Sequence, residues 1–156
     1  MHANAALIER FYRAFGARDA DGVVACYHPD VQFSDPVFPD LRGDRARAMW
    51  RLLILRGKDL RVEARDFVAD DATGSAHWDA WYTFSATGRP VHNSIDARFT
   101  FRDGLIHTHR DTFDLWRWAA QALGAKGSLL GWSGFVQGAI RKQAARALDD
   151  FVAKQG

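Results

Sequence analysis

The stretch Pro29-Asp30-Val31-Gln32-Phe33-Ser34-Asp35-Pro36-Val37 is the part of the sequence from which the fold is most readily inferred. Its alternation places Val31, Phe33 and Asp35 on one face of a predicted strand. Because two of these side chains are apolar, we expect the shared face to point toward a core or a pocket. A carboxylate on such a face is either a paired structural acid or a base with a raised pKa. Asp35 is therefore the first candidate for a functional residue.

Helical patterns lie on both sides of this strand. The first has an apolar stripe made of Leu7, Ile8, Phe11, Tyr12 and Phe15. A second, short helix is predicted to follow Asp19 or Asp21, both of which are good N-cap residues. Downstream of the strand, Asp44 is expected to cap a third helix that runs to about Arg56. Gly57 is then a suitable C-terminal stop.

Four strand-like stretches follow the third helix. They cover residues 60–69, 75–85, 91–102 and 105–115, and turn sequences such as Asp103-Gly104 separate them. The alternation of apolar and polar residues is clearest in the second and third stretches. Helices that precede a run of hairpin-linked strands indicate an α+β protein, with helices packed on one face of a curved antiparallel sheet.

Composition restricts the class of protein. The 156 residues carry a net charge of +2, with 47% hydrophobic and 26% charged residues, which is typical of a single globular domain. So small a charge argues against a nucleic-acid partner, because such affinity comes from many phosphate contacts. The single cysteine, Cys26, cannot form an intramolecular disulfide. No segment is apolar enough to span a membrane and no signal peptide is visible, so we expect a cytoplasmic protein without a membrane partner.

A second polar group lies near the end of the predicted sheet. His109 and Asp111 share a strand face, with Cα atoms about 7 Å apart. They are interpreted either as a structural polar pair or as an acid/base pair beside Asp35. A metal site that adds His107 is an alternative, but no ligand spacing is diagnostic, and we predict neither a metal nor a cofactor.

The order of these motifs resembles the nuclear transport factor 2-like superfamily, and within it the SnoaL-like and ketosteroid-isomerase-like proteins. The resemblance rests on residues 17–22, 27–36 and 99–106, and on His109 and Asp111 followed by Phe113 and Asp114. It implies a cone-shaped curved sheet wrapped around the N-terminal helices, with an apolar pocket for a small hydrophobic organic molecule, and often a homodimer. Residues 1–156 would form a single SnoaL-like domain, with a core at about 5–115 and a helical extension at about 116–156.

The same resemblance assigns chemical roles by position. Asp35 matches the general base of ketosteroid isomerases, which are a worked example of pKa tuning. Phe11 and Ala97 stand where those enzymes have the Tyr and the protonated Asp of the oxyanion hole, so a standard steroid isomerase is not expected. In the epoxide hydrolases of the superfamily, an Asp-Arg-Asp set activates water. Asp96 and Arg98 would supply part of such a set here, but the alternation places them on the opposite face.

Three functions stay open at this point. The first is an isomerase-, cyclase- or hydrolase-like enzyme that uses Asp35, His109 and Asp111 for proton transfer or water activation. The others are a non-catalytic ligand-binding protein and a dimeric interaction module on the same fold. The expected pocket lining comprises Phe11, Tyr12, Phe33, Trp50, Trp78, Tyr82, Asn93, Ala97 and Phe113.

The C-terminal region carries more large apolar residues than an exposed tail should. They are Trp116, Trp118, Leu129, Leu130, Trp132 and Phe135. We expect these side chains to be buried, and a long final helix capped by Ser128 to close the wide end of the cone. Glycines 131, 134 and 138 would permit close packing, or a break in the helix near Gly134.

Overall fold

A computed structural model describes residues 1–155 of the chain and contains three N-terminal helices. They are α1 (Ala3–Gly16), α2 (Ala20–Ala25) and α3 (Asp44–Arg56). The Asp19 carboxylate accepts a hydrogen bond from the Gly22 amide at 2.9 Å, which confirms one of the two predicted caps of α2. Asp44 is the first residue of α3 rather than its cap, because Gly43 occupies the cap position with a φ of +54°. That conformation favours glycine.

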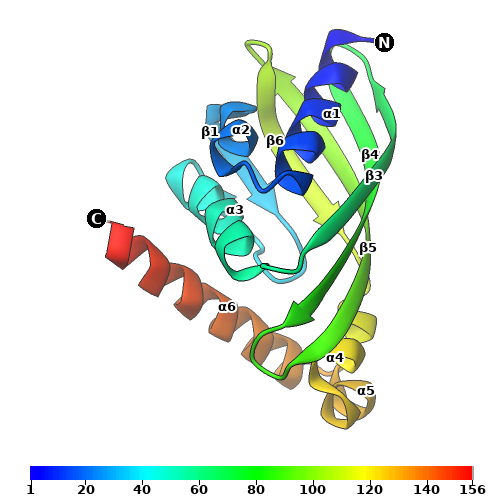
Figure 1. The fold of residues 1–156 in the computed structure, drawn as a ribbon, viewed down its shortest axis with the longest axis vertical. Coiled ribbons are helices and arrows are strands. Elements are labelled where there is room, and N and C mark those ends of the chain that lie inside the picture. Colours follow the sequence, from blue (N-terminus) through cyan, green and yellow to red (C-terminus); the bar gives the residue numbers. More distant parts are fainter. Residues whose placement is uncertain (156) are drawn as a thin grey trace.

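Six strands form one sheet. They are β1 (Tyr27–Ser34), β2 (Leu41–Arg42), β3 (Arg61–Ala69), β4 (Thr73–Phe84), β5 (Arg89–Arg102) and β6 (Leu105–Thr112). The strand order is β2-β1-β6-β5-β4-β3, and the sheet curves around α1 (Figure 1). The predicted α+β class is confirmed. The sheet is mixed, however, because β1 pairs with β6 in parallel. A parallel pair needs a long connection, and α3 with strands β2 to β5 supplies it.

The core lies between the concave face of the sheet and helices α1 and α3. Strand β5 shows the expected alternation, with Ile95, Ala97 and Phe99 buried and the residues between them exposed. The largest fully buried side chains in the described chain include Phe11, Phe15, Phe33, Trp50, Phe99 and His109. This part of the cone is therefore filled by the protein's own side chains.

Three helices follow the sheet. They are α4 (Leu115–Leu123), α5 (Ala125–Leu130) and α6 (Gly134–Gln155). The prediction of a long helix capped by Ser128 is wrong, whereas the alternative of a break near Gly134 is confirmed, because residues 131–133 separate α5 from α6. Ser133 caps the last helix instead, since its hydroxyl oxygen accepts from the Val136 amide at 3.2 Å. Helix α6 then crosses the open end of the sheet and runs along α3 (Figure 1).

The expected burial of the C-terminal apolar residues is also wrong for all but one of them. Trp118 is buried, whereas Trp116, Leu129, Leu130, Trp132 and Phe135 are exposed. Helix α6 packs instead through Val136 and Leu148, and Arg45 of α3 forms an ion pair with Asp149 at 2.9 Å. The break after α5 is the physical reason for this exposure. Because the helix is interrupted there, the residues before the break do not determine which face of α6 points inward.

Candidate functional site

Parallel pairing of β1 with β6 brings the first and last halves of the predicted site together. Phe33 is in register with His109, and Ser34 is in register with Arg110. Continuing this register by one residue places Asp35 beside Asp111, on the concave face that Phe33 and His109 share. The aromatic rings of Phe33 and His109 are in contact, with centroids 5.0 Å apart. Two carboxyl groups far apart in the sequence therefore come close enough for the charge of Asp111 to act on Asp35.

His109 lies at the centre of a buried chain of hydrogen bonds. Its Nε2 is 2.9 Å from Asp111 Oδ1, and its Nδ1 is 2.8 Å from the Tyr27 hydroxyl. The Trp50 indole N–H donates to the same hydroxyl oxygen at 2.7 Å. The Trp78 indole N–H makes a long contact of 3.5 Å with Asp111 Oδ1. A protein interior tolerates such polar groups only when they are satisfied in this way.

The chain of hydrogen bonds sets the tautomer of His109. An ionised Asp111 can only accept, so Nε2 of a neutral imidazole carries the hydrogen and donates it. Nδ1 is then an acceptor, and the Tyr27 hydroxyl donates to it. The His109 side chain has no solvent exposure and Asp111 has 3%, so this chain of hydrogen bonds holds the Asp111 carboxylate in place beneath the surface.

Asp35 is half-buried at the end of β1 and begins a turn. Its Oδ1 accepts from the amides of Val37 at 2.7 Å and Phe38 at 2.6 Å. The structural interpretation of Asp35 as a turn-forming acid is therefore confirmed. Burial nevertheless raises the pKa of the carboxyl to about 7; the Asp111 charge adds to that rise, and the two backbone hydrogen bonds oppose it.

The surroundings of Asp35 contain a second set of polar groups. The Tyr82 hydroxyl oxygen accepts from the Trp118 indole at 2.7 Å. Burial raises the pKa of Tyr82, and the Asp35 charge raises it further despite that hydrogen bond. Asn93 is buried on the same face, diagonal to Tyr82 in the β4–β5 register. Arg141 of α6 donates to the Pro36 carbonyl at 2.8 Å, which fastens α6 over this region.

We call Asp35, Tyr82, Asn93, Asp111 and Phe113 the open-end cluster. Tyr82 and Phe113 are partly buried and pack against both hydrophobic clusters of the protein, one under α1 and α3 and the other under α4. Within this cluster, Asp35 lies next to a contact with α6, because Arg141 donates to the carbonyl of the neighbouring Pro36. The remaining predicted lining residues are Phe11, Tyr12, Phe33, Trp50, Trp78 and Ala97, which are all buried in the core. They support the cluster rather than surround open space.

Tyr12 is the exception within that core. Its hydroxyl is the one fully buried side-chain polar atom in the described chain without a hydrogen-bond partner. Burial raises the pKa of Tyr12 well above its ordinary value, and the Asp111 charge adds to this rise. An unpartnered buried hydroxyl costs stability. Its neighbours Trp78 and Phe99 offer it only ring faces and edges.

Sequence reasoning missed three residues that matter to this arrangement. Tyr27 was not among the candidate site residues, but it is the first residue of β1 and its hydroxyl bonds to His109. Trp118 and Arg141 lie in the tail, far from the strand motifs. The sequence did contain a signal for Tyr27, which is two positions before Pro29. Once the strand is recognised, Tyr27 faces the same side as Val31. Nothing in the sequence marks the other two.

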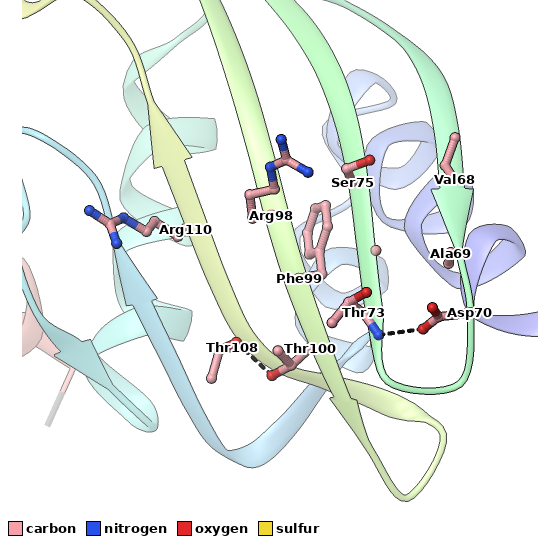
Figure 2. A pocket seen from close by; sticks show the side chains of 11 residues that line it. Val68, Ala69, Asp70, Thr73, Ser75, Arg98, Phe99, Thr100, Thr108 and Arg110 are labelled. Carbon is pink, nitrogen blue, oxygen red and sulfur yellow. Dashed lines mark hydrogen bonds between the residues drawn. The ribbon is translucent and has the colours of Figure 1, made fainter.

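Two open depressions of the surface lie outside the open-end cluster, although Phe33 and His109 are among the residues that line the smaller one. The larger, of about 610 Å³, is on the face of the sheet that points away from α1 (Figure 2). Arg98, Thr100, Thr108 and Arg110 line its middle, and the two threonine hydroxyls are 2.6 Å apart. The smaller, of about 290 Å³, lies beside β1 and β6. Neither includes Asp35, Tyr82 or Asn93.

Two further properties bear on what the site can bind. Within residues 1–155, no three His, Cys, Asp or Glu side chains converge in a way that would hold a metal ion. Among the same residues, no helix combines the length and hydropathy needed to cross a membrane.

Several known proteins share this architecture. A putative polyketide cyclase from Xanthomonas campestris pv. campestris is 26% identical, with 76% of this chain and 96% of that chain covered and a TM-score of 0.62. A Mycobacterium tuberculosis LEH-like epoxide hydrolase is 22% identical, covering 84% and 97%, with a TM-score of 0.62. TerC, co-crystallised with polyporic acid, is 22% identical, covering 72% and 92%, with a TM-score of 0.62. No curated protein matches the sequence significantly.

The sequence itself identifies the family. A family model described as a SnoaL-like domain matches residues 8–109, which include all of α1 to β5 except the first turn of α1, and β6 as far as His109. This match extends over more than half of the chain, and the fold agrees with it. The chain belongs to the SnoaL-like domain family of the nuclear transport factor 2-like superfamily.

Proposed function

We propose that this protein binds a small, mostly apolar organic molecule at the open-end cluster and that Asp35 acts on it as a general base. The observation that carries the proposal is the environment of Asp35, a half-buried carboxyl beside Asp111 with a pKa of about 7. A base is most effective when its pKa lies near the working pH, because it can then both take up and release a proton.

The chemistry of the surroundings suggests the class of ligand. Phe113 of the cluster, and Phe38 in the turn that Asp35 begins, are partly buried apolar side chains that retain surface a ligand can cover. The Tyr82 oxygen already accepts from Trp118, so its own hydrogen is available to donate. The Asn93 amide offers a second donor. Two donors near a base in apolar surroundings suit a ligand with a carbonyl group.

The proposed reaction is proton abstraction next to that carbonyl. Asp35 takes the proton as the C–H bond breaks, and the electron pair moves onto the carbonyl oxygen as an enolate. Tyr82 and Asn93 donate hydrogen bonds to this oxyanion and so stabilise it. The proton then returns to another carbon, or the enolate closes a ring on a second carbonyl. The same base could activate water, as in the hydrolase alternative.

His109 and Asp111 have positioning roles in this proposal. The ring of His109 is enclosed by aromatic side chains and makes no contact with open space, so it acts through Asp111. Asp111 in turn raises the pKa of Asp35 through its charge. A putative polyketide cyclase and an LEH-like epoxide hydrolase share the fold, which agrees with acid–base chemistry in this family without specifying it.

Hydrogen–deuterium exchange tests the base without knowledge of the substrate. The protein is incubated in D₂O with a panel of small cyclic and aromatic ketones, and loss of the α-proton signals is followed by NMR. The wild type should accelerate exchange in at least one ketone, and Asp35→Asn should abolish the effect. Asp40→Asn is the matched control, because Asp40 is an exposed acid in the same loop that pairs with Arg42. Exchange that survives in Asp35→Asn would refute the proposed base.

A non-catalytic ligand-binding protein is the second candidate. One observation favours it: Asp35 Oδ1 already accepts two backbone hydrogen bonds that stabilise the turn, which gives this carboxyl a structural role. Native mass spectrometry of the purified protein would detect a retained ligand. A ligand that binds equally well to the wild type and to Asp35→Asn, with no exchange in any ketone, would support binding alone.

A further inference from the structure

We propose that the tip between α5 and α6 inserts into the interface of an anionic lipid bilayer. The tip comprises the exposed residues Leu129, Leu130, Trp132 and Phe135, and Trp116 of α4 lies against it. Their exposed fractions run from 46% to 86%, and Phe135 has the highest value. The other exposed large apolar residues of the described chain, such as Leu55 and Val68, are scattered. A concentrated apolar patch of this kind marks an interaction surface.

The shape of the tip favours a bilayer over a groove-filling partner. Helices α4 and α5 and the start of α6 lie at the end of the molecule opposite the N-terminus (Figure 1). The patch residues lie in or between these helices and are exposed, and neither of the two surface depressions includes any of them. Exposed Trp, Phe and Leu side chains suit insertion at the level of the lipid headgroups, where Trp is favoured.

The backbone carbonyl groups of the tip are hydrogen-bonded within the protein, which suits a low-dielectric environment. Four consecutive carbonyls accept hydrogen bonds from side chains. Trp116 donates to Ser128 O at 3.0 Å, and Trp132 donates to Leu129 O at 2.9 Å. Ser133 donates to Leu130 O at 2.6 Å, and Gln137 donates to Gly131 O at 2.8 Å. Water could satisfy these carbonyls at an ordinary surface, whereas lipid cannot, so internal partners allow the turn to be buried there.

Charge complementarity selects an anionic surface. Residues 115–148 contain no Asp or Glu, although the whole chain has 19 of them. The same segment contains Arg117, Lys126, Arg141, Lys142 and Arg146. All but Arg141, which bonds to Pro36, are exposed. Basic residues beside an apolar tip attract anionic headgroups.

The same charge distribution disfavours a second copy of this chain as the occupant. In a two-fold contact the patch would meet itself, and Lys126 and Lys142 would face like charges. The proposal replaces the expectation of no membrane partner. That expectation rested on the lack of a spanning segment, which does not bear on a tip that lies within one interface only. The proposal is also independent of the function of the open-end cluster.

Vesicle flotation tests the proposal with the full chain. Phosphatidylcholine vesicles with and without phosphatidylglycerol are mixed with the protein at low salt. We expect binding to the anionic vesicles that is weaker with pure phosphatidylcholine and weaker at high salt. Leu129→Ser with Phe135→Ser should reduce binding roughly tenfold or more. Leu55→Ser with Val68→Ser is the matched control, since it removes two exposed apolar residues elsewhere, at 59% and 64% exposure, and should bind like the wild type.

A charge variant and a mass measurement complete the test. Lys126→Glu with Lys142→Glu should remove the preference for anionic vesicles. The proposal is overturned if the wild type does not float with anionic vesicles, or if the Leu129/Phe135 variant floats as well as the wild type. It is also overturned if light scattering shows that this variant has a smaller assembly mass than the wild type, because the patch would then be covered by another copy of the chain.

Discussion

Asp35 directly follows β1 and Asp111 lies in β6, each one residue beyond the last parallel pair, Ser34 with Arg110, and the charge of Asp111 acts on the Asp35 carboxyl. Their environments differ. Asp111 is held by His109 at 2.9 Å, whereas Asp35 is held by backbone amides of its own turn. Two neighbouring acids in different surroundings tend to divide the acid and base roles between them. Here the burial of Asp35 and the charge of Asp111 both favour the protonated form of Asp35.

This relationship predicts how stability depends on pH. The pKa of Asp35 is about 7 in the folded chain, above its ordinary value of 3.8. Between these values the folded chain retains a proton that the unfolded chain has released, so the contribution of Asp35 to stability falls as pH rises. Asp35→Asn should therefore lose less stability than the wild type between pH 4 and pH 7. Urea unfolding at several pH values measures this, and parallel pH profiles of the two proteins would contradict it.

The hydrogen bonds around His109 predict opposite effects for two buried tyrosines. Tyr27→Phe leaves both the Trp50 N–H and His109 Nδ1 without a partner and should cost about 2–3 kcal/mol. Tyr12→Phe removes a hydroxyl that has no partner and should be neutral or stabilising. Both substitutions delete one oxygen from a buried ring, so each is a control for the other. Equal changes in the free energy of unfolding would show that the hydrogen bonds do not matter.

Two glycines of the tail should respond differently to a methyl group. A Cβ at Gly127 would lie 1.8 Å from the Ala119 carbonyl oxygen, so Gly127→Ala must separate α4 from α5 and lower the melting temperature strongly. A Cβ at Gly138 would meet nothing within 4 Å. Gly138→Ala should stabilise α6 by up to about 1 kcal/mol. Differential scanning calorimetry of both variants gives the comparison, and a stable Gly127→Ala protein would contradict the close packing.

Helix α6 is expected to protect the interior. Leu148 is fully buried, and Leu148→Ala should cost about 2–5 kcal/mol, whereas Leu129→Ala at an exposed position should cost little. Removal of residues 125–156 should uncover the open-end cluster, raise the fluorescence of a hydrophobic dye and lower the melting temperature. A truncated protein with the melting temperature and dye binding of the full chain would show that α6 does not protect the interior.

We also expect a homodimer formed through the outer face of the sheet. Trp81 lies there between His92, with ring centroids 4.5 Å apart, and Arg61, whose guanidinium is 4.0 Å from the ring centroid. Such a mixture of aromatic and charged groups is common in interfaces. Light scattering should give twice the 17.5 kDa mass of the chain, and Trp81→Glu should give the single mass. A wild-type monomer at micromolar concentration would contradict the prediction.

Local sequence was sufficient for most secondary structure. Alternation in residues 75–85 and 91–102 predicted the ends of β4 and β5 to within two residues. Successive side chains of a strand point to opposite faces, so its apolar and polar residues alternate in the sequence. Asp19 and Gly57 marked helix ends for a similarly local reason. The expectation for the tail failed because Ser128 satisfies the same local rule as Ser133, and only the packing of α5 on α4 decides between them.

The same distinction between local sequence and tertiary packing applies to the candidate site. The sequence by itself determined that Asp35, His109 and Asp111 lie on apolar strand faces, since alternation assigns each residue a face. Only the tertiary structure decided that β1 lies parallel to β6, and hence that Asp35 is the neighbour of Asp111. It alone enclosed His109 among aromatic rings, paired it with Tyr27, and left the apolar tip outside the core. Strand partners and helix packing depend on contacts between distant segments, and no local pattern encodes these contacts.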